Sequence, residues 1–309
     1  FAEIMNFRGL NQSLDAGMIV GAMNTLGVSF KDPWIAGDHI SFAFDLIIDE
    51  WNHTFLPYYL NRKYYGIKFG KWWDYKLKLS LDLALRNEKF LSQETKFIID
   101  DFKILNIKPT FSYDKRDIYR NPTSGFLIIS VFDYNQIYNK NRYRLILTNS
   151  ISKYFNLRNF IFGFNTSFST LLGSDDEKMI KYFGGLNSIR GWKVPSFENF
   201  NNPNDQYRFG NHNLIFSSEI RKDLIEYSSL NIMDLNFEKG LTSLIFYDIG
   251  FNSKELETLL KINNLPLIGI GFGFRVPFLG NVIGPDFGWS YYDKSFISSA
   301  IHIRIGQKF

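Results

Sequence analysis

The sequence predicts an all-β protein: a transmembrane antiparallel β-barrel of about 16 strands with a long lumenal loop. Three observations lead to this prediction. Apolar and polar residues alternate with a period of two, the alternating segments are long, and aromatic residues are abundant (Phe 32, Tyr 17, Trp 6). Aromatic residues at this level exclude a disordered chain. No apolar run approaches the ~18 residues that a transmembrane helix needs.

The alternation is clearest between Tyr75 and Arg86. Leucine occupies every second position there, and most of the intervening residues are charged or small. Residues at alternate positions share one face of a strand, whereas a helix would scatter them around its axis. The apolar face consists of Leu77, Leu79, Leu81, Leu83 and Leu85.

The end of the chain repeats this pattern. The segment Leu267–Phe278 alternates large apolar residues with Gly and Arg. In the last segment, charged and small residues separate a second apolar face. That face consists of Ile297, Ile301, Ile303, Ile305 and Phe309.

Strand length separates two architectures that both alternate. A soluble β-sandwich, which is the alternative, has strands of about 5–6 residues and buries its apolar face. A membrane-spanning strand needs ~9–11 residues, and many segments here reach that length. Several full charges on the polar face favour a barrel with an apolar outside and a polar inside. Such a closed barrel satisfies its backbone groups in lipid without helices.

Fifteen segments carry the pattern. The first is already under way at Phe1, and single-chain bacterial barrels have an even number of strands. We therefore expect one further strand upstream. The predicted strands are Phe1–Phe7, Ser13–Met23, Thr25–Trp34, His39–Trp51, Arg62–Trp73, Tyr75–Lys89, Ile98–Asp114, Ser124–Tyr134, Arg142–Tyr154, Asn159–Thr170, Asn211–Asp223, Leu241–Asn252, Leu267–Phe278, Val282–Tyr292 and Phe296–Phe309.

One segment, from residue 171 to residue 210, interrupts the strands. A connection of this length is usually functional, and its hydrophobic residues predict that it is packed. We therefore expect residues 1–309 to form one outer-membrane barrel domain with the loop 171–210 folded into its lumen.

The segment Tyr182–Trp192, YFGGLNSIRGW, resembles the lumenal-loop motif of the BamA family of outer-membrane assembly factors. That motif has a Gly-Gly pair followed by Val/Ile-Arg-Gly and an aromatic residue, which is more usually Phe or Tyr than Trp. The matching residues here are Gly184, Gly185, Ile189, Arg190, Gly191 and Trp192.

Further features follow in the family's order. The segments SSEI (217–220) and FYDIG (246–250) resemble the two strands after the loop, and the chain ends in the aromatic Phe309. The segment YDKRDIYRNPTSG (113–125) looks like the family's strand-turn-strand signature. Its matching residues are Asp114, Arg116, Asp117, Pro122 and Gly125.

The resemblance implies a sixteen-stranded barrel in the bacterial outer membrane, preceded by POTRA domains that lie outside this chain. It implies folding and insertion of other β-barrel proteins, or movement of polypeptide, with no chemical reaction and no cofactor. The implied partners are unfolded outer-membrane protein clients, accessory lipoproteins or periplasmic chaperones, and the lipid bilayer. An organellar outer membrane is the less favoured location.

In the family, acidic side chains on the two strands after the loop hold the motif arginine. The matching positions are Glu219 and Asp248, so we expect Arg190 to lock the loop inside the barrel. A buried guanidinium needs carboxylates or carbonyls around it. The alternative is that Arg190 is a solvated loop residue.

A barrel that inserts other barrels must open somewhere, and the seam between its first and last strands is the cheapest place. Gly306 interrupts the last strand shortly before Phe309, and glycine weakens a strand. We expect the seam strand to kink there. The alternative is that Gly306 is a small inward-facing residue.

Other functions remain as alternatives. A secretion pore (a TamA-like factor, a two-partner secretion transporter or the barrel of a patatin-type autotransporter) would differ in its upstream domains, and a passive porin would not need a locked loop. An enzyme is not expected, because no Ser-His-acid or paired-acid set converges. The absence of Cys and the scattered His predict no metal site. A net charge of +4 is too small to indicate nucleic acid.

Overall fold

The computed structural model describes residues 2–7, 9–21, 23–36, 39–119, 121–174, 177–186, 188–232, 235–261, 264–278 and 281–309. The chain forms two compact units. Unit 1 comprises Phe1–Tyr113, Ile129–Thr148 and Leu171–Met179. Unit 2 comprises Asp114–Ile128, Asn149–Thr170 and Ile180–Phe309.

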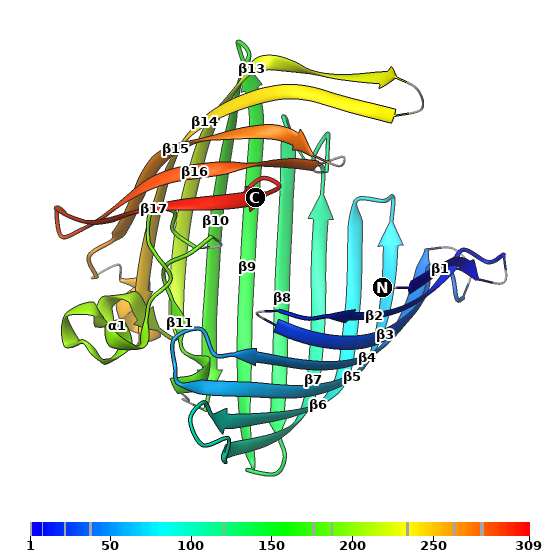
Figure 1. The fold of residues 1–309 in the computed structure, drawn as a ribbon, viewed down its shortest axis with the longest axis vertical. Helices are drawn as coiled ribbons and strands as arrows, with labels where there is room; N and C mark the ends of the chain where they lie inside the picture. Colours follow the sequence, from blue (N-terminus) through cyan, green and yellow to red (C-terminus); the bar gives the residue numbers. More distant parts are fainter. Residues whose placement is uncertain are drawn as a thin grey trace. The chain divides into compact units, whose positions relative to one another are not determined.

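Fifteen strands of the described residues form one antiparallel sheet, in which every strand pairs with its neighbours in sequence (Figure 1). They overlap the fifteen predicted segments one for one, which confirms the all-β fold. The strands are β1 Ala2–Phe7, β2 Gln12–Ile19, β3 Met23–Asp32, β4 Ile40–Asn52, β5 Tyr58–Trp73, β6 Leu77–Ser92, β7 Ile98–Asp114, β8 Gly125–Ile137, β9 Arg142–Leu157, β10 Phe160–Gly173, β13 His212–Ile232, β14 Leu235–Ser253, β15 Leu267–Phe278, β16 Asn281–Tyr292 and β17 Ser295–Ile305.

The largest error in the predicted boundaries falls on the β13–β14 hairpin. The prediction ended its first strand at Asp223 and began its second at Leu241, but the strands continue to Ile232 and from Leu235. The pairing register shifts twice, between Asp223 and Ile225 and between Ile225 and Ser228. A β-bulge inserts an extra residue, so it breaks the period of two from which the strands were predicted.

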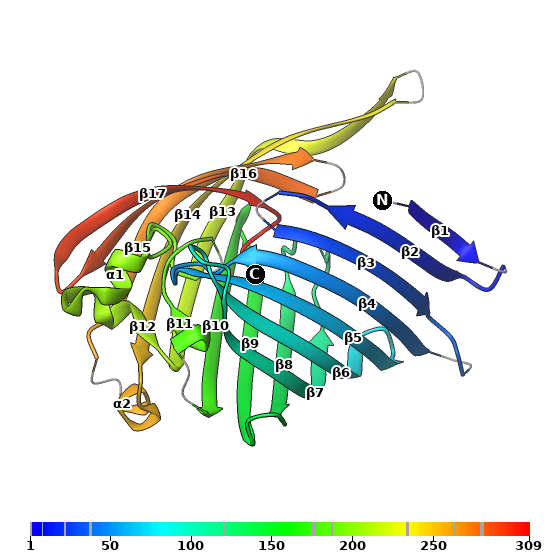
Figure 2. The same cartoon turned by 60° about the horizontal axis from the view of Figure 1, so that its bottom comes forward.

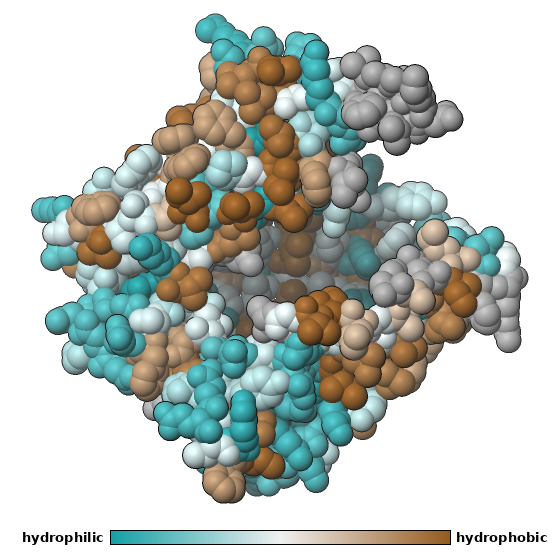
Figure 3. All heavy atoms as spheres, viewed as in Figure 1, coloured by the Kyte–Doolittle hydropathy of each residue, from teal (hydrophilic) through white to brown (hydrophobic). Residues whose placement is uncertain are grey.

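The sheet buries its polar face and exposes its apolar face. On β6 in unit 1, Leu81 and Leu85 are 36% and 54% exposed, whereas Asp82 and Glu88 are each 6% exposed. Figure 3 shows hydrophobic side chains along the outer surface of the strands. A soluble sandwich has the opposite arrangement, so the β-sandwich alternative is wrong and the pattern is that of a membrane barrel.

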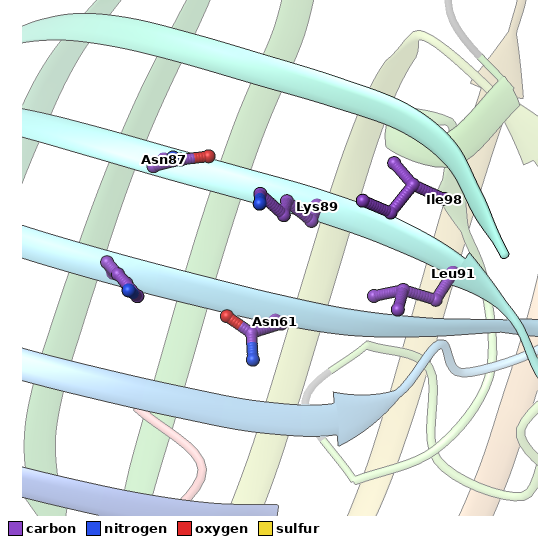
Figure 4. Close-up of a pocket in the computed structure, with 6 residues that line it drawn as sticks. Asn61, Asn87, Lys89, Leu91 and Ile98 are labelled. Carbon is purple, nitrogen blue, oxygen red and sulfur yellow. The ribbon is translucent and has the colours of Figure 1, made fainter. Parts of the chain in front are cut away.

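The apolar outer face of unit 1 ends before the strands do. Beyond Leu85, the same face of β6 carries Asn87 and Lys89, which line a shallow hollow of about 300 Å³ together with Asn61 of β5 (Figure 4). Polar groups cannot be satisfied in the hydrocarbon region. The lipid-facing band of these strands therefore lies on the side of Leu79–Leu85.

The connection between β10 and β13 contains most of the remaining regular structure. In unit 2, α1 (Phe197–Asn201) contacts η2 (Pro203–Arg208) and belongs to this long connection, drawn in yellow-green in Figure 2. None of the helices in the described residues is long and apolar enough to cross a membrane. The short elements are η1 Glu177–Met179, β11 Lys181–Tyr182, α1 Phe197–Asn201, η2 Pro203–Arg208, β12 Phe209–Gly210 and, between β14 and β15, α2 Leu256–Leu260.

Replacing Leu81 by Lys should destabilise the folded chain in a bilayer by about 2–4 kcal/mol, because it places an ammonium group on the lipid-facing side of a strand. The free energy of unfolding in lipid vesicles, measured by urea titration, checks this. The control is Lys89→Arg, at the polar end of the same face, which should leave the stability unchanged. Equal stability of Leu81→Lys and the parent chain would contradict the lipid-facing assignment.

Candidate functional site

Two buried carboxylates on neighbouring strands of unit 2 form the base of the site. Glu219 lies on β13 and Asp248 on β14, and their exposed fractions are 2% and 0%. Ser217 pairs with Asp248 and Glu219 pairs with Phe246, so the two acids are diagonal neighbours on the same face. Side chains at such positions lie within reach of one long residue.

Arg190 of the long loop reaches both acids. Its Nε and Nη2 donate to Asp248 Oδ2 and Oδ1, both at 2.9 Å, and its backbone N–H donates to Oδ2 at 3.0 Å. Its Nη1 donates to Glu219. The guanidinium carbon lies 3.8 Å from the ring centroid of Phe246, a cation–π contact. We call Arg190, Glu219 and Asp248 the loop lock.

The loop lock places a fully buried guanidinium against two fully buried carboxylates. Taking such charges out of water is costly, so the pairing need not stabilise the fold relative to apolar residues. Removing one member of the loop lock is destabilising, because the buried charge of its partner is then left uncompensated. What the pairing specifies is one position of the loop against β13 and β14.

Small residues let the loop backbone approach the sheet. Gly191 has φ +87°, and a Cβ there would come within 2.8 Å of the backbone of Trp289 on β16. On the sheet side, a Cβ at Gly288 would meet the backbone of Gly191 at 2.6 Å, and a Cβ at Gly269 would meet Arg190 O. Glycine is therefore required on both surfaces of this contact.

Two apolar motif residues flank Arg190. Ile189 and Trp192 are buried in a cluster with Phe183 of the loop and Leu267 of β15. The indole N–H of Trp192 also donates to the carbonyl of Ile268 at 2.9 Å. A buried Trp needs such an acceptor, so the residue that departs from the family's usual Phe or Tyr has its own partner here.

The Gly-Gly pair connects the beginning of the motif to its end. Gly184 and Gly185 have φ of +136° and +84°, and Gly185 N–H donates to the carbonyl of Trp192 at 2.8 Å. Gly184 N–H donates to Ser188 Oγ at 2.8 Å. These bonds hold the two ends of the motif together, so Arg190 is presented by an ordered turn.

The strand-turn-strand motif builds a second turn of unit 2. Arg116 Nε and Nη2 donate to Asp114 at 2.9 and 2.8 Å. Asp117 accepts the backbone N–H groups of Ile118, Thr123 and Ser124 at 2.9–3.1 Å. The acidic residues thus satisfy the backbone of the turn between β7 and β8.

The remaining residues of this turn connect it to the site. Gly125 has φ +99°, and a Cβ there would meet Arg116 Cα at 2.8 Å. Pro122 is buried, and its carbonyl accepts from Arg221 Nη2 at 2.8 Å. Arg221 follows Glu219 on the same face of β13, and its Nε lies 3.9 Å from a Glu219 carboxylate oxygen. The turn and the loop lock therefore share β13.

The end of the chain departs from the prediction. β17 stops at Ile305, and Gly306 adopts φ +88°. The prediction put Phe309 in the strand, on the same face as the exposed isoleucines. Instead its ring packs against Tyr154, which is 1% exposed, at 6.1 Å between centroids. The left-handed backbone at Gly306 ends the strand, and a period of two does not continue past such a residue.

Three cationic residues form contacts that the sequence did not predict. Lys308 donates to Asp248 Oδ2 at 2.8 Å, and Arg221 holds the β7–β8 turn. In unit 1, Lys178 of the same loop forms an ion pair with Asp100 at 2.8 Å. The alternation placed Lys308 on the polar face, but no sequence signal pairs it with a carboxylate 60 residues away.

No cluster of three or more His, Cys, Asp or Glu side chains suited to a metal ion occurs within the described ranges. The contacts of the loop lock are hydrogen bonds and ion pairs, which can hold or release a segment of chain.

The polar buried face, the apolar outer face and the inward-packed loop define an outer-membrane β-barrel protein. A family comparison matches the Omp85 superfamily domain over residues 6–309. The chain belongs to the Omp85 superfamily, and like the barrels of that family it is an outer-membrane protein. The comparison with curated proteins gives no match.

Among solved structures, the chain is similar to BamA from Haemophilus ducreyi lacking POTRA domains 1–3, with a TM-score of 0.69 and 15% identity. It is also similar to CdiB from Escherichia coli (0.59, 10%) and CdiB from Acinetobacter baumannii (0.56, 13%). The matches cover 98–99% of this chain but 65%, 58% and 55% of those chains. At these identities the likeness establishes the fold.

Replacing Asp248 by Asn should cost about 3–5 kcal/mol of unfolding free energy, because the buried Arg190 and Lys308 lose their shared charge partner. Urea unfolding in detergent, monitored by Trp fluorescence, measures this change in the free energy of unfolding. The control is Asp293→Asn in the exposed β16–β17 turn. A cost no larger than that of the control would contradict the ion pairing described here.

Asp117 gives the β7–β8 turn a pH dependence. Burial opposes the charged form, but hydrogen bonds from Thr123, Ser124 and Ile118 hold the pKa of the Asp117 carboxyl below its usual value. Because the pKa is depressed, the stabilisation is present above the ordinary Asp pKa and is lost as the pH falls below about 4.

Amide exchange checks this expectation. The N–H groups of Thr123 and Ser124 should be protected near neutral pH and lose protection in acid, and Asp117→Asn should lose much of that protection at all pH values. Asp74→Asn, in the β5–β6 turn, is the control. Protection that is independent of both pH and the Asp117 substitution would refute the role of this carboxylate.

Proposed function

We propose that this chain is the membrane domain of a bacterial outer-membrane assembly factor that folds and inserts other β-barrel proteins. The observation that carries the proposal is the motif loop, with Arg190 bound to Glu219 and Asp248 on the two following strands. A passive porin would not need this segment packed against its buried face. The likeness to BamA supports the fold on which the proposal rests.

The edge of the sheet suits such a role. β17 is the last strand in the pairing order, and β16 is its partner among the described strands. A strand edge offers unpaired N–H and C=O groups to an incoming strand. Clients would pair at this edge while they enter the membrane, and the turn at Gly306 shortens the strand that they meet.

Movement of polypeptide across the membrane is the second candidate, because the same fold occurs in the two CdiB proteins. The proposed partners are unfolded barrel proteins in the first case and an unfolded exported chain in the second. Periplasmic chaperones or accessory lipoproteins would deliver the clients, and POTRA domains upstream of the barrel would receive them. Neither activity calls for a cofactor or an enzymatic step.

Depletion of the full-length protein in its host should lower the amount of many other β-barrels in the outer membrane. Quantitative mass spectrometry of outer-membrane fractions measures this. A host depleted of an unrelated porin is the control, since its other barrels should keep their levels. Unchanged barrels, together with the loss of one exported protein from the medium, would contradict the assembly function and favour secretion.

A further inference from the structure

The carboxylate of Asp248 has two cationic partners that come from different parts of unit 2. Lys308 Nζ donates to Asp248 Oδ2 at 2.8 Å, and that same oxygen accepts two N–H groups of Arg190. Lys308 Nζ also donates to Ser217 Oγ at 2.9 Å, and its side chain is 7% exposed. Arg190 by itself already gives Asp248 three hydrogen bonds, so the loop lock does not require Lys308.

Residues outside the loop hold Lys308 in place. Gly306 N–H donates to the carbonyl of Val282 at 2.6 Å, and Gln307 Nε2 donates to Asn121 Oδ1 at 2.9 Å. On the other side, Phe309 packs on Tyr154. These contacts involve β16, β9 and the β7–β8 turn, so they would persist if the loop moved away.

The second acid of the loop lock also has a partner outside the loop, because Arg221 lies 3.9 Å from Glu219. With the loop in place, three cations of the described residues (Arg190, Arg221, Lys308) form ion pairs with the two acids. Arg275 and Arg304, paired with Asp286, add further positive charge beside this cluster. If Arg190 leaves with the loop, the excess of positive charge falls by one, while Asp248 keeps Lys308 and Glu219 keeps Arg221. The cluster is therefore better balanced without the loop than with it.

This balance bears on how readily the loop can leave. Removing one partner of a buried ion pair is costly because the other charge stays uncompensated. We propose that Lys308 is a reserve counter-ion of Asp248: a positioning residue that keeps the carboxylate compensated when Arg190 withdraws, and so makes docking of the loop reversible. This inference concerns the loop alone and holds whichever client the protein serves.

The reserve counter-ion predicts a direction of pH dependence. Lys308 follows the last strand, and burial lowers the pKa of its ammonium group to about 8; Asp248 and Glu219 oppose this shift and Arg190 adds to it. His302 also faces it. When the loop leaves, the repulsion from Arg190 disappears and the pKa of Lys308 rises. Higher pH favours the state with the lower pKa, so docking should strengthen as the pH rises through 8.

Trypsin cleavage after Arg190 reports loop release, because this residue is fully buried while the loop is docked. The full-length protein in lipid vesicles is digested, and cleavage is quantified by mass spectrometry relative to the heat-unfolded protein. Lys308→Met should slow cleavage about tenfold, within the usual range of coupling between sites, because Asp248 then depends on Arg190 for its charge compensation. Lys308→Arg should restore the parent rate. The control, Lys254→Met at an exposed position, should change nothing.

Cleavage that is unchanged or faster in Lys308→Met would overturn the proposal. If that variant fails to fold, the pH profile decides. Cleavage of the parent protein should fall between about pH 7 and about pH 9.5, whereas Lys308→Arg should show no such fall, because a guanidinium keeps its charge. The same pH profile in both proteins would equally overturn it.

Discussion

The buried carboxylate of Asp248 is the constraint on which the described site depends. A carboxylate removed from water must be compensated, and here the compensation comes from Arg190 of the loop and Lys308 of the tail. Because Asp248 orients both Arg190 and Lys308, the loop and the end of the chain are held by the same residue of β14. The ionic contacts therefore specify positions more than they add stability.

The inverted sheet makes such a site possible. In a soluble protein the buried face of a sheet is apolar, and three guanidinium or ammonium groups could not gather there without great cost. A membrane barrel assigns its apolar residues to the lipid and leaves the other face free for charge. Asp82 and Glu88 on β6 show the same assignment in unit 1, far from the loop lock in sequence.

Backbone fit is the second requirement of the site. Arg190 reaches Asp248 with its own N–H as well as its side chain, so the loop backbone must lie directly on the sheet. Gly191 on the loop and Gly269 and Gly288 on the strands make this approach possible. Larger residues there would lift the loop away and lengthen its hydrogen bonds, even with every charge preserved.

The sequence by itself determined the fifteen strands, their two faces and the segments that would carry the site. Strand alternation is a local property with a fixed period, and the loop motif is contiguous, so both can be recognised without knowledge of the fold. The alternation did not predict the extensions of β13 and β14 beyond the bulges near Ile225, because each bulge adds a residue to one strand alone.

Only the tertiary structure decided which distant groups meet. Lys308 contacts Asp248, and Arg221 contacts the turn at Pro122, although these residues are 60 and 99 positions apart and lie on segments that do not pair as strands. The inward course of Phe309 depends on the φ angle of one glycine. Such contacts are set by the assembled strands and leave no periodic trace in the chain, so residue spacing alone could not supply them.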